Sequence, residues 1–211
     1  MSETKTSGSV VFLVDDDAAV RASVTELLES VGLEVAAYES AAGFLESTMP
    51  DKPSCMVLDL RMPEISGLKL QEELAKAEVQ VPIVFVSGHG DIRTVVRAMK
   101  AGAMDFLAKP FNSQELLEAV HAALERDRVR REKENSLSTL RERFSSLSVR
   151  EKEVLSHVAS GRLNKQIAAD LGVSEVMVKV HRANGMRKLH VKSVAELVRI
   201  TDLLRSTHLM A

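Results

Sequence analysis

The chain has 211 residues, an apolar content of 45% and a formal net charge of −2, which suits one or two globular domains. The first residues, MSETKTSGS, are polar and no apolar stretch approaches about 18 residues, so we expect neither a signal peptide nor a membrane span. The single cysteine, Cys55, excludes an internal disulfide and fits a cytoplasmic location.

The charge is distributed unevenly along the chain. Residues 1–126 carry a net charge of −9 and residues 127–211 a net charge of +7, which together give the overall −2. An acidic half joined to a basic half indicates two domains, the second of which faces a polyanion. Basic surfaces are common, so this asymmetry alone is weak evidence.

Short apolar runs and amphipathic segments alternate through the first half. Such runs are typical of strands in a parallel sheet, where both faces of a strand are buried. The predicted strands are Val10–Val14, Glu34–Tyr38, Cys55–Leu58, Ile83–Val86 and Met104–Leu107. The predicted helices begin after Asp17, at Ala41, near Ser66, at Ile92 and after Phe111, where Asn112 or Ser113 can cap the helix. This repeat predicts an α/β doubly wound five-stranded parallel sheet.

Polar residues follow four of these runs, at the carboxyl end of each strand, where open α/β sheets bind ligands. Asp16 and Asp59 can supply carboxylate oxygens to Mg²⁺, and Asp15 can hold a metal-bound water. Asp59 is the best candidate for a nucleophile that accepts a phosphoryl group. Lys109 and Ser87 would then bind the phosphoryl oxygens. A helix cap is the ordinary role of one such Asp, but turns do not easily explain polar residues at four strand ends.

Residues 9–126 resemble the receiver domain of two-component response regulators, which has a flavodoxin-like fold. The resemblance is carried by VDDDAAVR, VLDLRMPEISGL, PIVFVSGHGD and AMKAGAMDFLAKPF. It implies that a sensor histidine kinase phosphorylates Asp59, as in a phosphorelay, and that Asp15 and Asp16 are the acidic pair. It also implies that the backbone carbonyl of Arg61 is a further ligand of the Mg²⁺ or Mn²⁺ ion.

The same resemblance implies a switch pair beside the phosphoacceptor. Ser87 would move toward the phosphoryl group, and Phe106 would turn inward into the vacated space. Lys109-Pro110 would be a cis peptide, an option that proline makes accessible. A one-residue slip of the alignment would favour Asp17, but the Asp15–Asp16 alignment gives Arg21 its usual spacing.

Residues 127–145 are predicted to form a helical linker. There is no Gly or Pro from Leu116 to Phe144, and the segment ERDRVRREKE is almost wholly charged. A continuous helix stabilised by i,i+4 ion pairs is the simplest interpretation, and a partly frayed linker is the alternative. Weak heptad-like spacing leaves a coiled-coil seam open.

The basic half after Ser145 contains only helical patterns. Ser148-x-x-Glu151 is a capping box that opens the first helix. Asn164 can cap a short second helix, and Ser174 can cap a longer one after a turn at Gly172. Two helices joined through a glycine-containing turn, the second with a basic face, form a helix-turn-helix.

Residues 146–208 resemble the LuxR-type helix-turn-helix domain found in the NarL/FixJ class of response regulators. The matching stretches are LSVREKEVLSHVASGRLNKQIAADLGVSEVMVKVHRANGMRKL and KSVAELV. The resemblance implies that Ser174–Leu189 is the recognition helix. The residues implied to contact DNA are Lys165, Ser174, Lys179, Val180, Arg182, Ala183, Arg187, Lys188 and Lys192. Lys165, Lys188 and Lys192 would contact phosphates, which orient the protein, while Lys179 and its neighbours would read bases.

Other residues of this half are assigned to the core, and one glycine is unusual. The predicted core residues are Ile167, Ala168, Leu171, Val173, Val178 and Leu189. Gly185 lies inside the proposed recognition helix and should cost about 1 kcal/mol against alanine. A close approach between helices or a mutation would each explain it.

These features predict a phosphorylation-controlled transcription factor that is not an enzyme. Phosphorylation of Asp59 would shift the receiver toward a homodimer that places two recognition helices on double-stranded DNA. FixJ-like relatives lean toward activation of transcription. The rivals are a metal-dependent phosphatase and a receiver whose helical half binds a protein. Arg61 argues against the phosphatase, because haloacid-dehalogenase-like sites normally carry an acid at that position.

Overall fold

The computed structural model describes residues 8–88 and 92–206, which form parts of two compact units, residues 1–132 and 133–211. The predicted end of the second domain at residue 208 and part of the stretch PIVFVSGHGD lie outside the described residues. Within the described ranges, no helix combines the length and the apolar character needed to cross a membrane.

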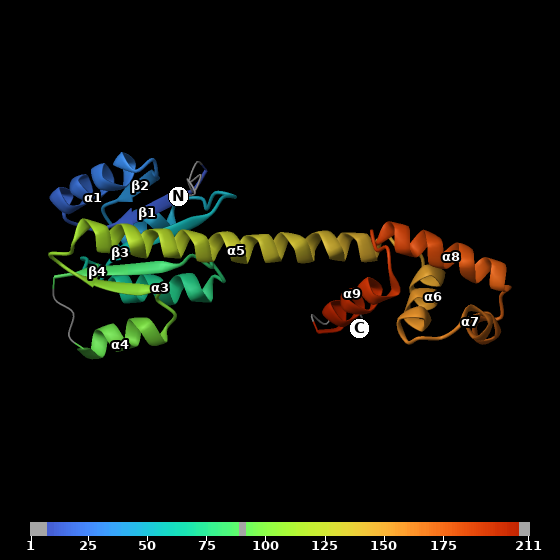
Figure 1. Cartoon of the computed structure of the whole chain (residues 1–211). Coiled ribbons are helices and arrows are strands. Elements are labelled where there is room, and N and C mark those ends of the chain that lie inside the picture. Colours follow the sequence, from blue (N-terminus) through green and yellow to red (C-terminus); the bar gives the residue numbers. More distant parts are fainter. Residues whose placement is uncertain (1–7, 89–91, 207–211) are drawn as a thin grey trace. The chain divides into compact units, whose positions relative to one another are not determined.

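The first unit contains a parallel sheet with the strand order β2-β1-β3-β4-β5 (Figure 1). The strands are β1 (Val10–Val14), β2 (Glu34–Tyr38), β3 (Ser54–Asp59), β4 (Ile83–Ser87) and β5 (Asp105–Ala108). The three central strands, β1, β3 and β4, are buried along their whole length, which explains their continuous apolar runs. The predicted doubly wound α/β fold is therefore confirmed, with five strand boundaries, in β3, β4 and β5, differing by one residue from the prediction.

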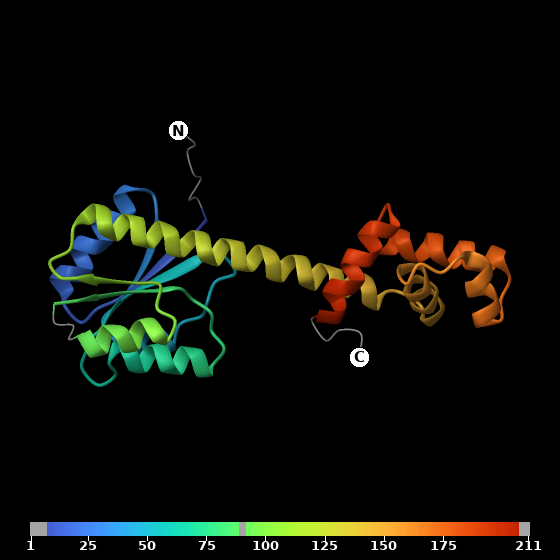
Figure 2. The same ribbon diagram turned by 60° about the horizontal axis from the view of Figure 1, so that its bottom comes forward.

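Within residues 8–88 and 92–206, five helices accompany this sheet. They are α1 (Ala18–Ser30), α2 (Ala41–Leu45), α3 (Gly67–Lys76), α4 (Ile92–Lys100) and α5 (Ser113–Ser145). Residues of α1 and α5 share one apolar core with one face of the sheet, and residues of α2, α3 and α4 share a second core with the other face. Figure 2 shows α1 and α5 on one side of the strands and α3 and α4 on the other.

Helix α5 runs without interruption from Ser113 to Ser145. Asn112 caps it, because the Asn112 Oδ1 accepts a hydrogen bond from the Gln114 N–H at 2.8 Å. The continuous helix predicted for the charged segment is therefore confirmed. The division between the two compact units falls inside this helix, after Glu132.

The described part of the second unit adds the short helices α6 (Val149–Ala159), α7 (Asn164–Leu171), α8 (Glu175–Lys188) and α9 (Val194–Ser206). The six residues predicted for its core all pack in one apolar cluster. The capping box at Ser148 and Glu151 is present. Helix α7 differs from the prediction, because its cap position is Leu163 and the Asn164 side chain instead accepts a hydrogen bond from Arg182 of α8.

Candidate functional site

The carboxyl ends of the strands bring the predicted pocket residues to one edge of the sheet. Asp15 follows β1, Asp59 ends β3, Ser87 ends β4 and Lys109 follows β5. The parallel register aligns these ends, since Asp59 pairs with Val86 and the Lys109 N–H donates to the Ser87 carbonyl at 2.9 Å. Residues up to 94 positions apart in the sequence therefore share one site.

The Lys109 ammonium lies between two carboxylates. Its Nζ is 2.6 Å from Asp15 Oδ2 and 2.8 Å from Asp59 Oδ2. Burial alone would lower the pKa of Lys109, but its hydrogen bonds to Asp15 and Asp59 outweigh burial and raise the pKa. The ammonium therefore stays charged and sits where it can neutralise negative charge on a group bound to Asp59.

The acidic groups form a cluster suited to a divalent cation. Carboxylate oxygens of Asp15, Asp16 and Asp59 all lie within 4.8 Å of one another. Asp15 is fully buried, Asp59 is 7% exposed, and Asp16 faces solvent. Three hard oxygen donors with one open side fit Mg²⁺, which prefers oxygen ligands and keeps several waters.

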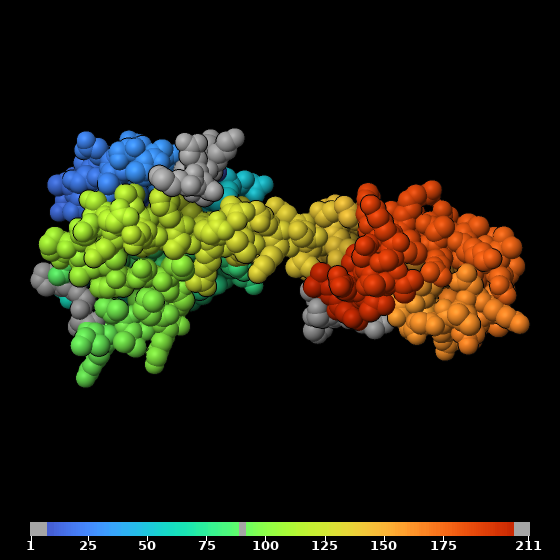
Figure 3. Space-filling view, viewed as in Figure 1, coloured from blue at the N-terminus to red at the C-terminus, as the bar shows by residue number. Residues whose placement is uncertain are grey.

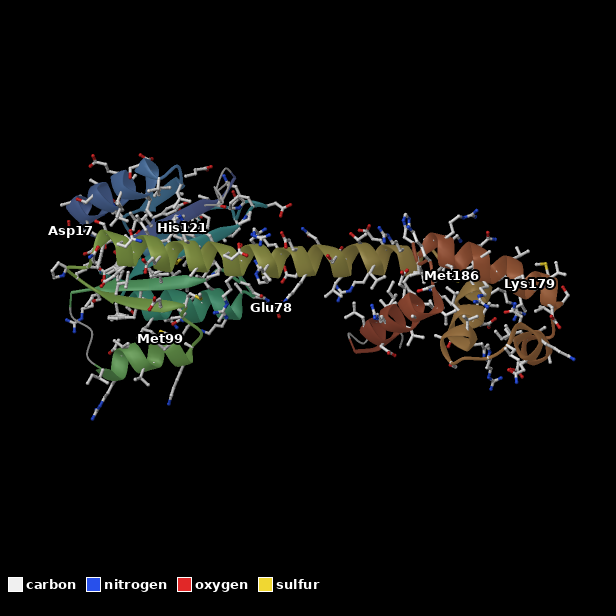
Figure 4. All side chains as sticks on the ribbon, in the orientation of Figure 1. Asp17, Glu78, Met99, His121, Lys179 and Met186 are labelled. Carbon is white, nitrogen blue, oxygen red and sulfur yellow. The ribbon has the colours of Figure 1, made fainter. Side chains whose placement is uncertain are left out.

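Asp17, the alternative acid, has a different role. Its Oδ1 accepts hydrogen bonds from the N–H groups of Ala19 and Val20 at 2.8 and 3.3 Å, which caps α1 (Figure 4). The structure therefore brings Asp15 and Asp16, rather than Asp17, to the Asp59 carboxylate.

Backbone contacts fix the direction of the Asp59 side chain. The Arg61 N–H donates to Asp59 Oδ1 at 3.1 Å, while the exposed Arg61 side chain plays no part in that bond. The first residue of α3, Gly67, approaches so closely that a Cβ there would lie 2.3 Å from the Asp59 carbonyl oxygen. A larger residue at Gly67 would displace the backbone that carries Asp59.

The two residues of the implied switch pair lie on neighbouring strands. Ser87 is 2% exposed at the end of β4, and Phe106 is half-buried on β5 against the core of the α3 face. Phe106 pairs with Phe85 in the sheet register. The peptide bond between Lys109 and Pro110 is cis, as the resemblance implied.

The helix-turn-helix of the second unit is formed by α7 and α8. Gly172 ends α7 with a positive φ of 66°, a conformation that glycine adopts without steric cost, and Ser174 caps α8 by accepting from the Met177 N–H at 3.3 Å. Lys179 and Ala183 are exposed, and Val180 is 44% exposed although it is apolar. Figure 4 labels Lys179 on the amino-terminal half of α8.

The remaining basic residues of this surface differ in their surroundings. Lys165 and Lys192 are exposed, whereas Arg182 is half-buried beside Asn164 and the exposed Arg187 donates to Asn184 at 3.0 Å. Lys188 is already paired, as its Nζ lies 2.7 Å from Glu151 Oε2 and 3.2 Å from the Ser146 carbonyl oxygen. The hydrogen bond from Lys188 lowers the pKa of Glu151, and so does the one from the Ser148 N–H. The ion pair thus ties the end of α8 to the start of α6.

Gly185 is explained by a close approach between helices. It is buried, and a Cβ built on it would lie 2.8 Å from Leu155 Cδ1 and 3.1 Å from Leu155 Cγ. Helix α8 can therefore pack against α6 only because position 185 has no side chain.

Three contacts beside the predicted residues were not predicted from the sequence, although Glu151 itself was assigned to the capping box of α6. Gly67 gives space beside Asp59, Arg21 donates to the Asp15 carbonyl at 2.8 Å, and Glu151 engages Lys188. Gly67 stands directly after the cap of α3, where a glycine is unusual, and its position could have indicated a close backbone contact. The partners of Arg21 and Glu151 carried no local signal.

Two family models match this chain. Residues 11–121 match the response regulator receiver domain, and residues 145–201 match the bacterial regulatory proteins of the LuxR family. Together the two matches span most of the sequence. The receiver model matches the first half and the LuxR-family model matches the second half.

Several curated relatives align with nearly the whole chain. The chain is 52% identical to Nodulation protein W of Bradyrhizobium diazoefficiens over 93% of its length and 86% of that protein. It is 47% identical to the response regulator protein TodT of Pseudomonas putida, covering 94% of this chain and 88% of TodT. The transcriptional regulatory protein FixJ of Azorhizobium caulinodans is 45% identical, with 92% of each chain covered.

A solved structure, that of the response regulator StyR, is similar over nearly the whole chain. It superimposes with a TM-score of 0.87 and 47% identity, covering 93% of this chain and 99% of StyR. TodT, FixJ and StyR are named as regulators, in agreement with a protein that is not an enzyme. The chain therefore belongs to the DNA-binding response regulators of two-component systems, in the NarL/FixJ class.

Proposed function

We propose that Asp59 accepts a phosphoryl group from the phosphohistidine of a sensor kinase in the cytoplasm. In that step the P–N bond of the donor breaks and an O–P bond forms on an Asp59 carboxylate oxygen. The observation that carries this proposal is the cluster of the Asp15, Asp16 and Asp59 carboxylates, two of which, Asp15 and Asp59, pair with the Lys109 ammonium. A lone carboxylate could not accept a dianionic group without such neutralisation.

The implied Mg²⁺ would be held by the carboxylates of Asp16 and Asp59 and by the Arg61 carbonyl, with Asp15 acting through a water. When bound, the ion supplies positive charge to the phosphoryl oxygens. The chain's own contribution is to orient Asp59 through the Arg61 N–H and to place the Lys109 and Ser87 side chains at the same strand edge. Lys109 would then exchange part of its contact with Asp59 for a phosphoryl oxygen.

The kinase needs a surface on which to dock beside Asp59. A cavity of about 580 Å³ opens between α1 and the segment that follows β5. It is lined mainly by apolar groups, including Val20, Leu27 and Phe111, and it reaches Lys109. An apolar face of a helical partner would bury this surface while its histidine approaches the pocket.

Phosphorylation would favour a receiver state in which Ser87 and Phe106 move and the surface of α4 changes. Helix α4 already exposes three large apolar side chains, Ile92 at 83%, Val96 at 44% and Met99 at 41%. Figure 3 shows α4, in light green, standing out from the surface of the receiver unit. These exposed side chains support a homodimer as the active form, because a second copy of the chain would bury them.

A dimer would present two α8 helices to two half-sites of double-stranded DNA, and binding there would activate transcription. Lys179, Val180, Arg182 and Ala183 would face bases, and Lys165 and Lys192 would contact phosphates. Ser174 and Arg187 flank the base-reading positions on α8. Lys188 is paired with Glu151 in this structure. It would contact a DNA phosphate only after that ion pair breaks.

Labelling with acetyl [³²P]phosphate tests the phosphoacceptor. We expect the wild-type chain to be labelled in the presence of Mg²⁺, and Asp59→Asn to remain unlabelled because the nucleophilic carboxylate is lost. The matched control is Asp17→Asn, which removes a neighbouring carboxylate that caps α1 and should keep most of the labelling. Labelling of Asp59→Asn at the wild-type level would refute the assignment.

A selection from random duplexes, followed by affinity measurements, tests the DNA surface. Lys179→Ala should lose about 1–3 kcal/mol of discrimination at one base position, because it would remove a base contact. Lys165→Ala should weaken binding to all duplexes alike and reduce the salt slope by about one. Uniform losses in both variants would contradict this division between base and phosphate contacts.

A further inference from the structure

A buried carboxylate lies in the most charged stretch of the chain. Asp127 is fully buried, although its neighbours Glu125 and Arg128 on the same helix are exposed. Removing an ionised carboxylate from water costs several kcal/mol unless charged and hydrogen-bonded partners offset it. Nothing in phosphoryl transfer uses Asp127, so its burial requires another explanation.

Four donors saturate this carboxylate. Asp127 Oδ1 accepts from the Arg130 Nε and Nη2 at 3.0 and 2.6 Å. Asp127 Oδ2 accepts from the Ser54 N–H at 2.9 Å and from the Arg131 Nε at 2.8 Å. Arg131 also reaches the preceding loop, at 3.1 Å from Asp51 Oδ1 and 3.4 Å from the Pro50 carbonyl oxygen. We refer to Asp127, Arg130, Arg131, Ser54 and Asp51 as the exit clasp.

The exit clasp lies at the amino-terminal edge of the sheet, opposite the phosphoacceptor. Ser54 is the first residue of β3, and Asp59 is the last. Among the described residues, the apolar core on this face of the sheet follows α5 as far as Leu124. Beyond Leu124 the clasp extends the attachment by about two more helical turns, because Asp127 stands three residues after Leu124 and Arg131 a further four.

We propose that Asp127 is the positioning residue that fixes where the linker helix leaves the receiver, so that phosphorylation of Asp59 controls DNA binding only while the exit clasp is closed. The inference rests on the proposed function. Aspartate suits the role because one short carboxylate binds a strand end and two guanidinium groups at once. Without it, the highly charged turn that follows would face water and fray, and a frayed helix cannot hold the linker in one direction.

The variant Asp127→Asn tests this proposal in the full-length chain. The amide can still accept from the Ser54 N–H, but it loses the charge that holds the two arginines. The matched control is Glu125→Gln, which removes an exposed carboxylate that pairs with Arg128 at 2.6 Å within the same helix. Three quantities are measured: hydrogen exchange of residues 128–135, labelling by acetyl phosphate, and DNA affinity with and without phosphodonor.

For Asp127→Asn we expect at least tenfold faster exchange in that segment, normal labelling, and loss of most of the phosphodonor-dependent gain in DNA affinity. Glu125→Gln should match the wild type in all three. Arg131→Gln removes the guanidinium that binds both Asp127 and Asp51, and its three measured values should lie between those of the wild type and Asp127→Asn. It replaces Asp127→Asn as the test variant if Asp127→Asn does not fold. A wild-type gain in DNA affinity in labelled Asp127→Asn would overturn the proposal, and so would a loss of labelling, which would indicate a damaged receiver. If the wild type and Glu125→Gln also show no gain, the proposed function itself fails.

Discussion

At the scale of single residues, the pocket is organised by opposing effects on charge. Burial raises the pKa of Asp15, while its hydrogen bond from Lys109 and the one from the Asp17 N–H counteract that rise. Lys109 thus offsets the cost of placing Asp15 and Asp59 side by side. Replacing Lys109 would leave the Asp15 and Asp59 carboxylates without the ammonium that pairs with both.

The ion pair between Glu151 and Lys188 gives a residue-scale prediction about pH. The pKa of Glu151 is lowered in the folded state by its hydrogen bonds from Lys188 and Ser148, relative to an ordinary value of 4.5. Its stabilising contribution is therefore fully present above the unfolded pKa and is lost as the pH falls through the folded pKa. We expect Glu151→Gln to lower the free energy of unfolding by about 1–2 kcal/mol at pH 7.

That difference should shrink as the pH falls below about 4.5, because Glu151 then becomes protonated in the wild type as well. Urea unfolding of the two proteins between pH 7 and pH 3 measures it. Glu153→Gln is the control, since Glu153 forms an exposed pair with Arg150 on the same helix and should change stability by less than about 0.5 kcal/mol. A difference for Glu151→Gln that stays constant over this range would rule out the ion pair as the cause.

Residue types and spacing were sufficient to predict the pocket, because each side chain follows an apolar run and the parallel topology brings strand ends together. Asp15, Asp16, Asp59, Ser87 and Lys109 were all placed in this way. The partners of Lys188 and Asp127 could not be predicted, as both are defined by contacts between distant segments. A basic residue on a helix gives no sequence signal that distinguishes a phosphate contact from an internal ion pair.

At the scale of elements, the packing of α8 on α6 determines what position 185 can hold. A side chain at Gly185 would gain helix propensity, but it would collide with Leu155, which lies only 2.8 Å from the position of a Cβ. Gly185→Leu should therefore lower the free energy of unfolding by about 1–2 kcal/mol. Ala183→Leu, on an exposed position of the same helix, should change it by less than about 0.5 kcal/mol.

A double-mutant cycle with Leu155 identifies the cause. Leu155→Ala alone should cost about 2–5 kcal/mol by leaving a cavity, which a leucine at position 185 would partly fill. The double variant should thus be more stable than the sum of the single changes predicts, by at least about 1 kcal/mol. Additive effects of the two substitutions would show that Gly185 is not required by this contact.

The elements themselves were largely predictable, and the exceptions have local causes. The buried strands and the helix caps at Ser148 and Ser174 were recognised from apolar runs and capping residues. The start of α7 was predicted wrongly because Asn164 is a favourable cap, yet its oxygen is used by Arg182 of another helix. A tertiary contact there replaced the local preference.

At the scale of the whole molecule, the opposite charges of the two halves correspond to two tasks. The acidic half contains the carboxylate cluster, and the basic half contains the helix-turn-helix. Long-range repulsion of DNA by the first half and attraction by the second favour contact with DNA through the second half. The charge asymmetry was readable from the sequence, whereas the contacts of Asp127, on which we propose that the coupling between the halves depends, were not.

The central claim is that phosphate on Asp59 controls DNA binding, and fluorescence anisotropy on a selected duplex measures it directly. The affinity of the full-length chain is compared with and without acetyl phosphate and Mg²⁺, beside that of Asp59→Asn. A coupling of about 1–3 kcal/mol predicts a gain of roughly 5–150-fold for the wild type and none for Asp59→Asn. Equal affinity of fully labelled and unlabelled wild-type protein, or the same gain in Asp59→Asn, would contradict the account.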